Sequence, residues 1–368
     1  MRRIAPVLLL LLLLHLAIAC DAGGGTSPLR SPAPSAAPAP TAPASASPRP
    51  EVTLVAAGDV MLGRTIGEGI ARHGPEWPLA PVAGVLRSAD IAFVNLESPL
   101  TARGVPADKD FVFRGPPAGA LGLARAGVDI VSLANNHVLD YGLEGLTDTM
   151  QALSEAGVSY AGAGADEAAA RSAAIIERNG LRVAFLAYVN TPPDSVSGFD
   201  ASSTRATPDR AGVAWLLPET VAADVTAARQ RADLVIVSMH TGTEYEDSPT
   251  ELQEAAAHAA IDAGATLVLG GHPHVLQGIE RYKGGLIIYS LGNFVFDFDN
   301  VDYAHPGLPS ALSAMLRVRM TAAGVLDCEI VPVAIAKADG RPHLAGAAEA
   351  PAVLERVSRL SDGSCGAH

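Results

Sequence analysis

The sequence predicts an α/β fold, because short buried strands alternate with helix-compatible stretches from residue 51 onward. Runs rich in apolar and β-branched residues lie at 52–57, 90–95, 129–134, 181–189, 233–240 and 265–271. Stretches rich in alanine and leucine lie at 79–89, 117–127, 143–157, 217–232 and 248–264. Strands that are apolar along their whole length and alternate with helices indicate a sheet that is covered on both faces.

The ends of the helices and the later part of the chain support this pattern. Gly127, Gly157 and Gly264 each follow a predicted helix, where a glycine C-cap is common. Beyond residue 275 the pattern changes, and strands joined by short turns are predicted at 275–292, 310–320 and 324–335. The polar segment 190–212 is predicted to be a long loop that forms a lid or rim.

The composition limits the classes to which this protein can belong. The chain has 368 residues, of which 49% are hydrophobic, so it can form a core in one large domain or two small ones. The formal net charge is −13, and no run of lysine or arginine occurs beyond the N-terminus. This charge distribution argues against binding to nucleic acid.

The N-terminus predicts export. Residues 1–20 combine two arginines, an apolar run and small residues before Cys20, which is the pattern of a secretory signal. The ending "LAIAC" resembles the motif at which bacterial lipoproteins are lipidated, although Ala17 stands where leucine is usual. We therefore expect a lipid on Cys20 to anchor the protein to the extracytoplasmic face of the cell envelope. An ordinary signal peptide with a chance cysteine is the alternative.

The remaining segments complete the domain organisation. Residues 21–50 are nearly all Ala, Pro, Ser, Gly and Thr, and they predict a disordered tether. A single domain is predicted over 51–340, followed by a C-terminal helix and tail over 341–368. Cys328 and Cys365 could pair in an oxidising compartment, but Cys365 lies in the predicted tail, so the sequence leaves this pairing open.

Polar residues follow five of the predicted strands. In open α/β sheets, ligands bind at the carboxyl ends of strands, and we expect these five ends to meet at one sheet edge. They carry Asp59, Asn95, Glu97, Asn135, Asn136, His137, Asp140, His240, His272 and His274. Such a mixed set of carboxylates, amides and imidazoles suits one or two divalent ions of Zn, Mn or Fe. The alternative is that these residues form hydrogen-bonded turns with one ion or none.

Five ordered motifs give the sequence a family resemblance. They are "GDVMLGR" (58–64), "NLESPLT" (95–101), "ANNHVLDYG" (134–142), "GGHPHVLQGIE" (270–280) and "YSLGNFVFD" (289–297). Together they resemble the CapA family, which is linked to poly-γ-glutamate or capsule biosynthesis and has a calcineurin-like metallophosphoesterase fold. The resemblance covers roughly residues 51–335. It implies an α/β fold built as a four-layer α-β-β-α sandwich.

The resemblance also implies residue roles. Asp59 and His274 would bind a first metal, Glu97 would bridge, and a second metal would take Asn136, His240 and His272. His137 would act as general acid, oriented by Asp140. The residues expected to contact substrate are Arg64, Asn95, Arg114, Asn135, Glu244, Tyr245 and Asn293. For Arg64 and Arg114 an exposed ion pair is an equal alternative to anion binding, and for Asn293 and Asp297 a β-turn is an equal alternative.

The sequence departs from the expected patterns at two positions. Met61 stands where ordinary metallophosphoesterases have a metal-binding histidine, as is expected for the CapA group, and a thioether is a poor ligand for a borderline ion. The first metal site is therefore expected to be weaker or absent. Thr241 stands where the family usually has a tryptophan, which changes the wall of the cleft.

Three functions are compatible with these residues. The first is an envelope enzyme of the metal-dependent phosphoesterase type that acts in production, export or remodelling of poly-γ-glutamate or a capsular polymer. The second is a non-catalytic lipoprotein that holds an anionic polymer beside a membrane-bound synthase. The third is a metal-dependent amide hydrolase that acts on the polymer itself.

Overall fold

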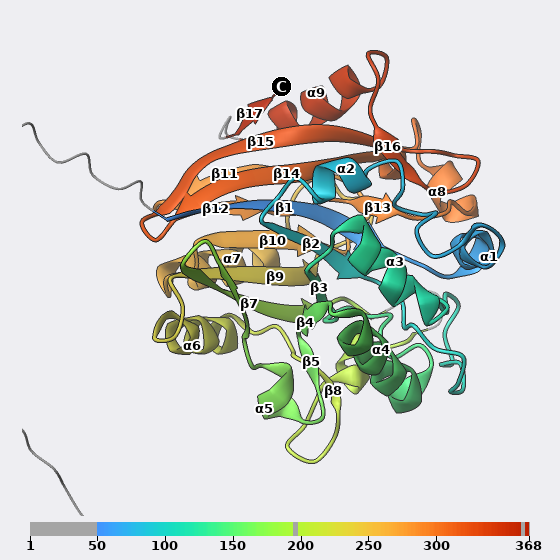
Figure 1. Ribbon diagram of the computed structural model, residues 1–368, viewed down its shortest axis with the longest axis horizontal. Helices are drawn as coiled ribbons and strands as arrows, with labels where there is room; N and C mark the ends of the chain where they lie inside the picture. Colours follow the sequence, from blue (N-terminus) through green and yellow to red (C-terminus); the bar gives the residue numbers. More distant parts are fainter. Residues whose placement is uncertain (1–49, 194–197, 362–364, 368) are drawn as a thin grey trace, which may run out of the picture. The chain divides into compact units, whose positions relative to one another are not determined.

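The computed structural model describes residues 50–193, 198–361 and 365–367 (Figure 1). The predicted signal peptide, Cys20 and the predicted tether, apart from Pro50, lie outside the described residues. None of the helices formed by the described residues is long and apolar enough to cross a membrane.

The larger sheet is built around β1, which delivers the first polar strand end. Within the described residues this sheet has nine strands, in the order β16-β15-β14-β1-β2-β3-β4, with β13 paired to β1 and β17 paired to β15. β1 is parallel to β2 and β13 but antiparallel to β14. The strands are β1 (Glu51–Val60), β2 (Ile91–Leu96), β3 (Ile130–Ser132), β4 (Ser159–Ala161), β13 (Asn293–Val295), β14 (Leu312–Thr321), β15 (Gly324–Ile335), β16 (Pro342–Leu344) and β17 (Gly366–Ala367).

A second sheet carries the histidine strands. In the described part of the chain it has six strands, in the order β11-β12-β10-β9-β7-β6. They are β6 (Ala174–Arg178), β7 (Leu181–Asn190), β9 (Leu234–Thr241), β10 (Leu267–Gly271), β11 (Ile279–Tyr282) and β12 (Gly285–Ile288). A small separate pair consists of β5 (Ala163–Gly164) and β8 (Gly212–Val213). The expectation of a single sheet edge was wrong, because buried strands of both sheets have the same apolar pattern.

The side chains of β7 show how the layers stack. Phe185 and Ala187 belong to the core cluster shared with the larger sheet, whereas Leu186 and Tyr188 belong to a second cluster. That second cluster also holds residues of α6 and α7, which cover the outer face of the smaller sheet. Because successive residues of a strand point to opposite faces, β7 is buried between the other sheet and these helices.

Helices complete the four-layer α-β-β-α sandwich, which confirms the predicted fold class (Figure 1). Leu86 of α2, Leu123 of α3 and Leu146 of α4 pack into the core cluster of the larger sheet. The helices are α1 (Arg64–His73), α2 (Ala83–Leu86), α3 (Ala118–Ala126), α4 (Gly142–Ala156), α5 (Glu167–Ala170), α6 (Pro218–Arg229), α7 (Glu251–Asp262), α8 (Asn300–Ala304) and α9 (Ala350–Leu360), with 3-10 turns at Ala201–Thr204 and Pro309–Ala311.

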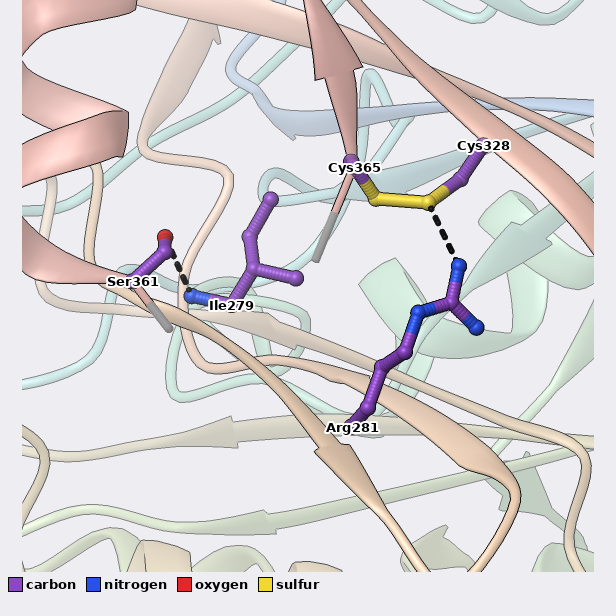
Figure 2. Close-up of a disulfide and its surroundings, with 5 residues drawn as sticks. All are labelled: Ile279, Arg281, Cys328, Ser361 and Cys365. Atoms are coloured by element: carbon purple, nitrogen blue, oxygen red, sulfur yellow. Dashed lines mark hydrogen bonds between the residues drawn. A yellow bond between two sulfur atoms is a disulfide. The ribbon is translucent and has the colours of Figure 1, made fainter. Parts of the chain in front are cut away.

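The C-terminal residues are bound to the sandwich. β16 and β17 both pair with β15, and α9 packs on β14 and β15. Cys328 and Cys365 form a disulfide, so the pairing that the sequence left open is present (Figure 2). A guanidinium nitrogen of Arg281 donates to Cys328 Sγ at 3.4 Å, and the backbone N–H of Ile279 donates to Ser361 Oγ at 2.8 Å. The end of the chain therefore links the larger sheet to β11 of the smaller one.

Candidate metal centre

Asp59 reaches the site because a glycine before it lets β1 lie close to the backbone of a neighbouring segment. A Cβ on Gly58 would lie 1.9 Å from the carbonyl oxygen of Gly292, so only glycine allows this approach. The N–H of Asp59 donates to the same carbonyl oxygen at 2.9 Å, and the register of β1 shifts at Asp59. Its carboxylate accepts from Asn95 Nδ2 at 2.8 Å and from the N–H of His272 at 3.1 Å. The penultimate residue of β1 is therefore a carboxylate that is held from both sheets.

The turn after β10 brings its histidines beside that carboxylate. A Cβ on Gly271 would lie 2.5 Å from Asp59 Oδ1, which explains the glycine before the His-Pro-His segment. His272 and His274 have backbone φ angles of 94° and 57°, a region that side-chain-bearing residues seldom adopt. Strained backbone of this kind is concentrated at functional sites.

Glu97 lies at the centre of the site. It follows β2, it is fully buried, and neither of its carboxylate oxygens has a hydrogen-bond partner among the described residues. Burial and the neighbouring Asp59 carboxylate raise the pKa of Glu97 well above its usual value. A buried carboxylate without partners is unfavourable unless a cation neutralises it, so this residue fits a metal ligand.

Two further atoms of the kind that bind metal ions lie near Glu97. His240 Nε2 is 3.5 Å from Glu97 Oε1 and 2.9 Å from Asn136 Oδ1. These separations are close to those of atoms that share one ion. Burial is the main cause that lowers the pKa of His240 well below its usual value, and it does the same for His272. Both imidazoles are therefore neutral, as metal binding requires.

His137 and Asp140 form a hydrogen-bonded pair, and a buried lysine contacts both side chains. His137 Nδ1 is 2.8 Å from Asp140 Oδ2, and the imidazole stacks on Phe113 at 4.0 Å between ring centroids. Lys109 Nζ is 2.5 Å from Asp140 Oδ1, 2.9 Å from the carbonyl oxygen of Asn136 and 3.2 Å from His137 Nδ1. No motif pointed to Lys109, which lies in a loop between two of the motifs.

A cleft of about 400 Å³ opens above these residues. Seven of the residues expected from the sequence line it: Arg64, Asn136, His137, Glu244, Tyr245, His272 and His274. Its walls also include the aromatic side chains of Phe111, Phe113, Phe199 and Phe296. Thr191, Pro192 and Pro193 of the predicted 190–212 loop also line it, although residues 194–197 of that loop lie outside the described residues.

Four of the expected substrate contacts do not line the cleft. Asn95 and Asn135 are buried behind it. Asn95 Nδ2 donates to the Asp59 carboxylate, and Asn135 donates to Asn95 Oδ1 and accepts from the N–H of His137. Asn293 is buried in β13 with its Oδ1 2.9 Å from His274 Nδ1, which places it in a strand and not in the alternative β-turn. Arg114 is exposed, and its guanidinium lies over the Tyr141 ring at 4.5 Å.

The remaining predicted residues have defined partners. Arg64 lies at the rim, where its guanidinium is 2.9 Å from Asp297 and 3.6 Å from Asp299. Met61 is fully buried, and its Sδ accepts from the N–H of Gly63 at 3.0 Å, so the sulfur is engaged within its own turn. The Thr241 hydroxyl donates to the carbonyl oxygen of Asn190.

The donor set fits a divalent ion. Among the described residues, two groups have ligand atoms that all lie within 4.8 Å of one another, namely Asp59, Glu97 and His274, and Glu244, His272 and His274. Carboxylate oxygens and neutral imidazole nitrogens are the ligands that Zn and Mn prefer. The unpartnered oxygens of Glu97 and the unpartnered Nδ1 of His272 are the atoms that such an ion would satisfy.

Stacked sheets covered by helices, with histidines and carboxylates from both sheets at one end, define a protein of the metallophosphoesterase-like class. The chain belongs to the family described as "Bacterial capsule synthesis protein PGA_cap", whose family model matches residues 53–298. The predicted family resemblance is thereby confirmed.

Relatives of known name agree with this membership. The capsule biosynthesis protein CapA of Bacillus anthracis is 32% identical over 300 residues, which cover 79% of this chain and 69% of that protein. The PGA biosynthesis protein CapA of Bacillus subtilis (strain 168) is 29% identical over 308 residues, covering 83% of this chain and 77% of that protein. A Mycobacterium tuberculosis protein named "Probable polyglutamine synthesis accessory protein" is 31% identical over 330 residues, covering 78% and 85% respectively.

Proposed function

We propose that this protein is a metal-dependent hydrolase of the phosphoesterase type, acting in poly-γ-glutamate or capsular polymer production, export or remodelling. The observation that carries the proposal is Glu97, a fully buried carboxylate with two unpartnered oxygens beside His240 and Asn136. A bound divalent ion would polarise phosphoryl oxygens and make a nucleophilic water available at neutral pH.

His137 is the residue placed to move a proton. Burial is the main cause that lowers its pKa to about 4, so its imidazole is neutral at pH 7. The contact with Asp140 favours the proton on Nδ1, and Nε2 then carries the lone pair on the side of Glu97, 4.0 Å away. The negative charge of a phosphate ester in the cleft favours the protonated imidazole. The proton on Nε2 can then pass to the leaving oxygen as the P–O bond breaks.

Arg64 is the cation at the rim that can meet an incoming anion. Its guanidinium is already paired with Asp297 and Asp299, so it presents a partly neutralised charge. Polar contacts from Arg64 and Tyr245, together with the aromatic walls, would orient the non-reacting part of the substrate.

A non-catalytic role in holding polymer is the second candidate, and Met61 favours it. Met61 stands where ordinary phosphoesterases have a metal-binding histidine. Its buried sulfur accepts a hydrogen bond within its own turn, so it does not replace that ligand. A metal-dependent amide hydrolase that cleaves the polymer would use the same donor atoms. In each case we propose export, lipid attachment at Cys20 and a membrane-bound synthase as partner, as the N-terminal sequence and the names of the relatives suggest.

The test is an assay of purified, metal-loaded protein with a panel of phosphate mono- and diesters and with poly-γ-glutamate. Hydrolysis of an ester that is lost with chelator and falls at least a hundredfold in His137→Gln supports the phosphoesterase. Shortening of the polymer without ester hydrolysis identifies the amide hydrolase. Polymer binding with no turnover of either substrate identifies the accessory role.

A further inference from the structure

The cations that line the cleft are already paired with carboxylates of the protein. Among the described residues, the guanidinium and ammonium groups of its lining belong to Arg64 and Lys109. Arg64 pairs with Asp297 at 2.9 Å, and Lys109 pairs with Asp140 at 2.5 Å. Neither group therefore presents an uncompensated positive charge to the organic part of a substrate.

Carboxylates line the same cleft. They belong to Glu244, Asp299 and Asp302, of which the last two lie at the start of α8. The whole chain has a formal net charge of −13, which has the same sign. Like charges repel, and the repulsion is focused in a cleft with walls of low dielectric constant. A substrate with further carboxylates beyond its phosphate is thus disfavoured, and poly-γ-glutamate carries one on every residue of the polymer.

Apolar side chains also line the cleft and remain open to a ligand. Phe111 and Val301 are 36% and 42% exposed although they lie in a concave site. Pro192 and Pro193 belong to the same lining. In ligand sites, exposed apolar surface of this kind packs against the apolar part of the ligand, and a few polar groups set its orientation. A ring suits such a wall because it buries a flat face.

Tyr245 is a fixed part of the wall. Its backbone φ is 62°, in the left-handed region, and its N–H donates to the carbonyl oxygen of Pro273 at 2.8 Å. Its ring stacks on His305 at 4.0 Å between centroids, and its hydroxyl is 3.2 Å from Asp302 Oδ1. A side chain held in this way loses little conformational freedom when a ligand binds, so the wall is preorganised.

We propose that the organic part of the substrate is an uncharged ring, a sugar or an aryl group, esterified to phosphate. The ring would pack against Phe111, Tyr245 and Val301 while its phosphate lies at the metal centre. Water adds across the P–O bond and releases the ring alcohol and inorganic phosphate. This substrate assignment rests on the proposed hydrolase. Asp299, Val301 and Asp302 lie beyond residues 53–298, so the family match does not describe this part of the wall.

The test uses pairs of ligands that have nearly the same shape and differ by one charge. The first pair is para-carbamoylbenzylphosphonate and para-carboxybenzylphosphonate, which cannot be hydrolysed, so calorimetry on metal-loaded protein measures binding alone. The second pair is α-glucosyl phosphate and α-glucuronosyl phosphate, followed by phosphate release. We expect the neutral member to bind or react roughly tenfold better in each pair, with a smaller difference at high salt. Excess poly-γ-glutamate should not displace the carbamoyl compound.

Two variants examine the wall itself. Val301→Lys adds a cation to the cleft and should reduce the preference for the neutral phosphonate at least threefold. Leu326→Lys adds the same charge at an exposed residue outside the cleft lining and should match the wild type. Phe111→Ala should weaken binding of para-carbamoylbenzylphosphonate at least threefold and leave binding of methylphosphonate, which has no ring, unchanged.

Equal or tighter binding of the carboxylated phosphonate, displacement by poly-γ-glutamate, or no phosphonate binding at all would overturn the assignment. Equal turnover of the two sugar phosphates would do the same. Failure of the proposed hydrolase gives a different result. In that case no phosphate is released from any ester, but the neutral phosphonate is still preferred and Val301→Lys still reduces that preference.

Discussion

The ammonium of Lys109 lies 2.5 Å from the carboxylate of Asp140, and the two side chains are only 3% and 1% exposed. The second oxygen of Asp140 contacts His137 at 2.8 Å and accepts from the N–H of Phe113 at 2.7 Å. Asp140 is therefore fixed by three partners. The orientation of His137 depends on a lysine that comes from a loop and not from a strand end.

Replacing Lys109 by methionine should destabilise the protein and impair the site. The change leaves the Asp140 carboxylate buried without its cation, which typically lowers the free energy of unfolding by about 3–5 kcal/mol. Urea unfolding measures the loss. Lys109→Met combined with Asp140→Asn should lose less than Lys109→Met alone, because no unpaired charge remains. Equal loss in Lys109→Met and in the exposed control Lys337→Met would contradict the buried ion pair.

Metal-free protein should lose stability in acid through His137. Its pKa is about 4 when folded and near 6.5 when unfolded, so between these values the unfolded chain binds a proton that the folded chain does not. The contribution is fully present above pH 6.5, and about 3 kcal/mol of it is lost as the pH falls to 4.

Comparison with His137→Gln isolates this contribution from the opposing effects of Asp59 and Glu97, whose raised pKa values favour the folded state in acid. Urea unfolding at pH 7 and pH 4.5 should show a smaller acid-induced loss in His137→Gln than in the wild type. The same substitution at exposed His73 is the control. Parallel pH profiles for wild type and His137→Gln would show that His137 is not buried as a neutral base.

Glu97→Gln should have opposite effects on stability and on metal binding. In metal-free protein at pH 7 it removes a carboxyl group whose charged form is disfavoured by burial and by Asp59, so the free energy of unfolding should rise. With metal present the wild type should become the more stable protein. Thermal unfolding with chelator and with Mn²⁺ measures both. A lower unfolding temperature than wild type under both conditions would indicate a purely structural role.

The Cys328–Cys365 disulfide should contribute measurably to stability. It closes a loop with a sequence separation of 37 residues, which corresponds to roughly 3–4 kcal/mol of lost chain entropy in the unfolded state. Cys328→Ser and Cys365→Ser should be equally destabilised, and reductant should bring the wild type to the same urea midpoint. An unchanged midpoint in reductant would show that β17 and α9 are held by their other contacts alone.

The strand ends were predictable from the sequence because a buried strand followed by a ligand residue is a local pattern. Asp59, Glu97, His240 and His272 are such residues, and all four lie together. The division of their strands between two sheets was not predictable from the apolar pattern, since pairing partners are set by contacts far apart in the sequence. The presence of two sheets was predicted only from the family resemblance, which implied the four-layer sandwich.

Other features depend on tertiary contacts that no local pattern records. Lys109 lies in a polar segment, and only the path of its loop brings it to Asp140. Arg114 follows the same loop but turns outward onto Tyr141. Helix α1 was missed because Gly67 and Gly69 weaken its helix propensity, yet a Cβ on Gly69 would lie 2.1 Å from the Trp77 ring, so close packing requires that glycine.

We expect residues from both sheets to build one metal centre. The most direct measurement is the bound metal in wild type, in Glu97→Gln from the larger sheet and in His240→Asn from the smaller one, by mass spectrometry after dialysis against Mn²⁺ or Zn²⁺. We predict one or two equivalents in the wild type and a clear loss in each variant, with the fold retained by circular dichroism. Metal content that is unchanged in both variants, or absent from the wild type, would show that the two sheets do not share a metal centre.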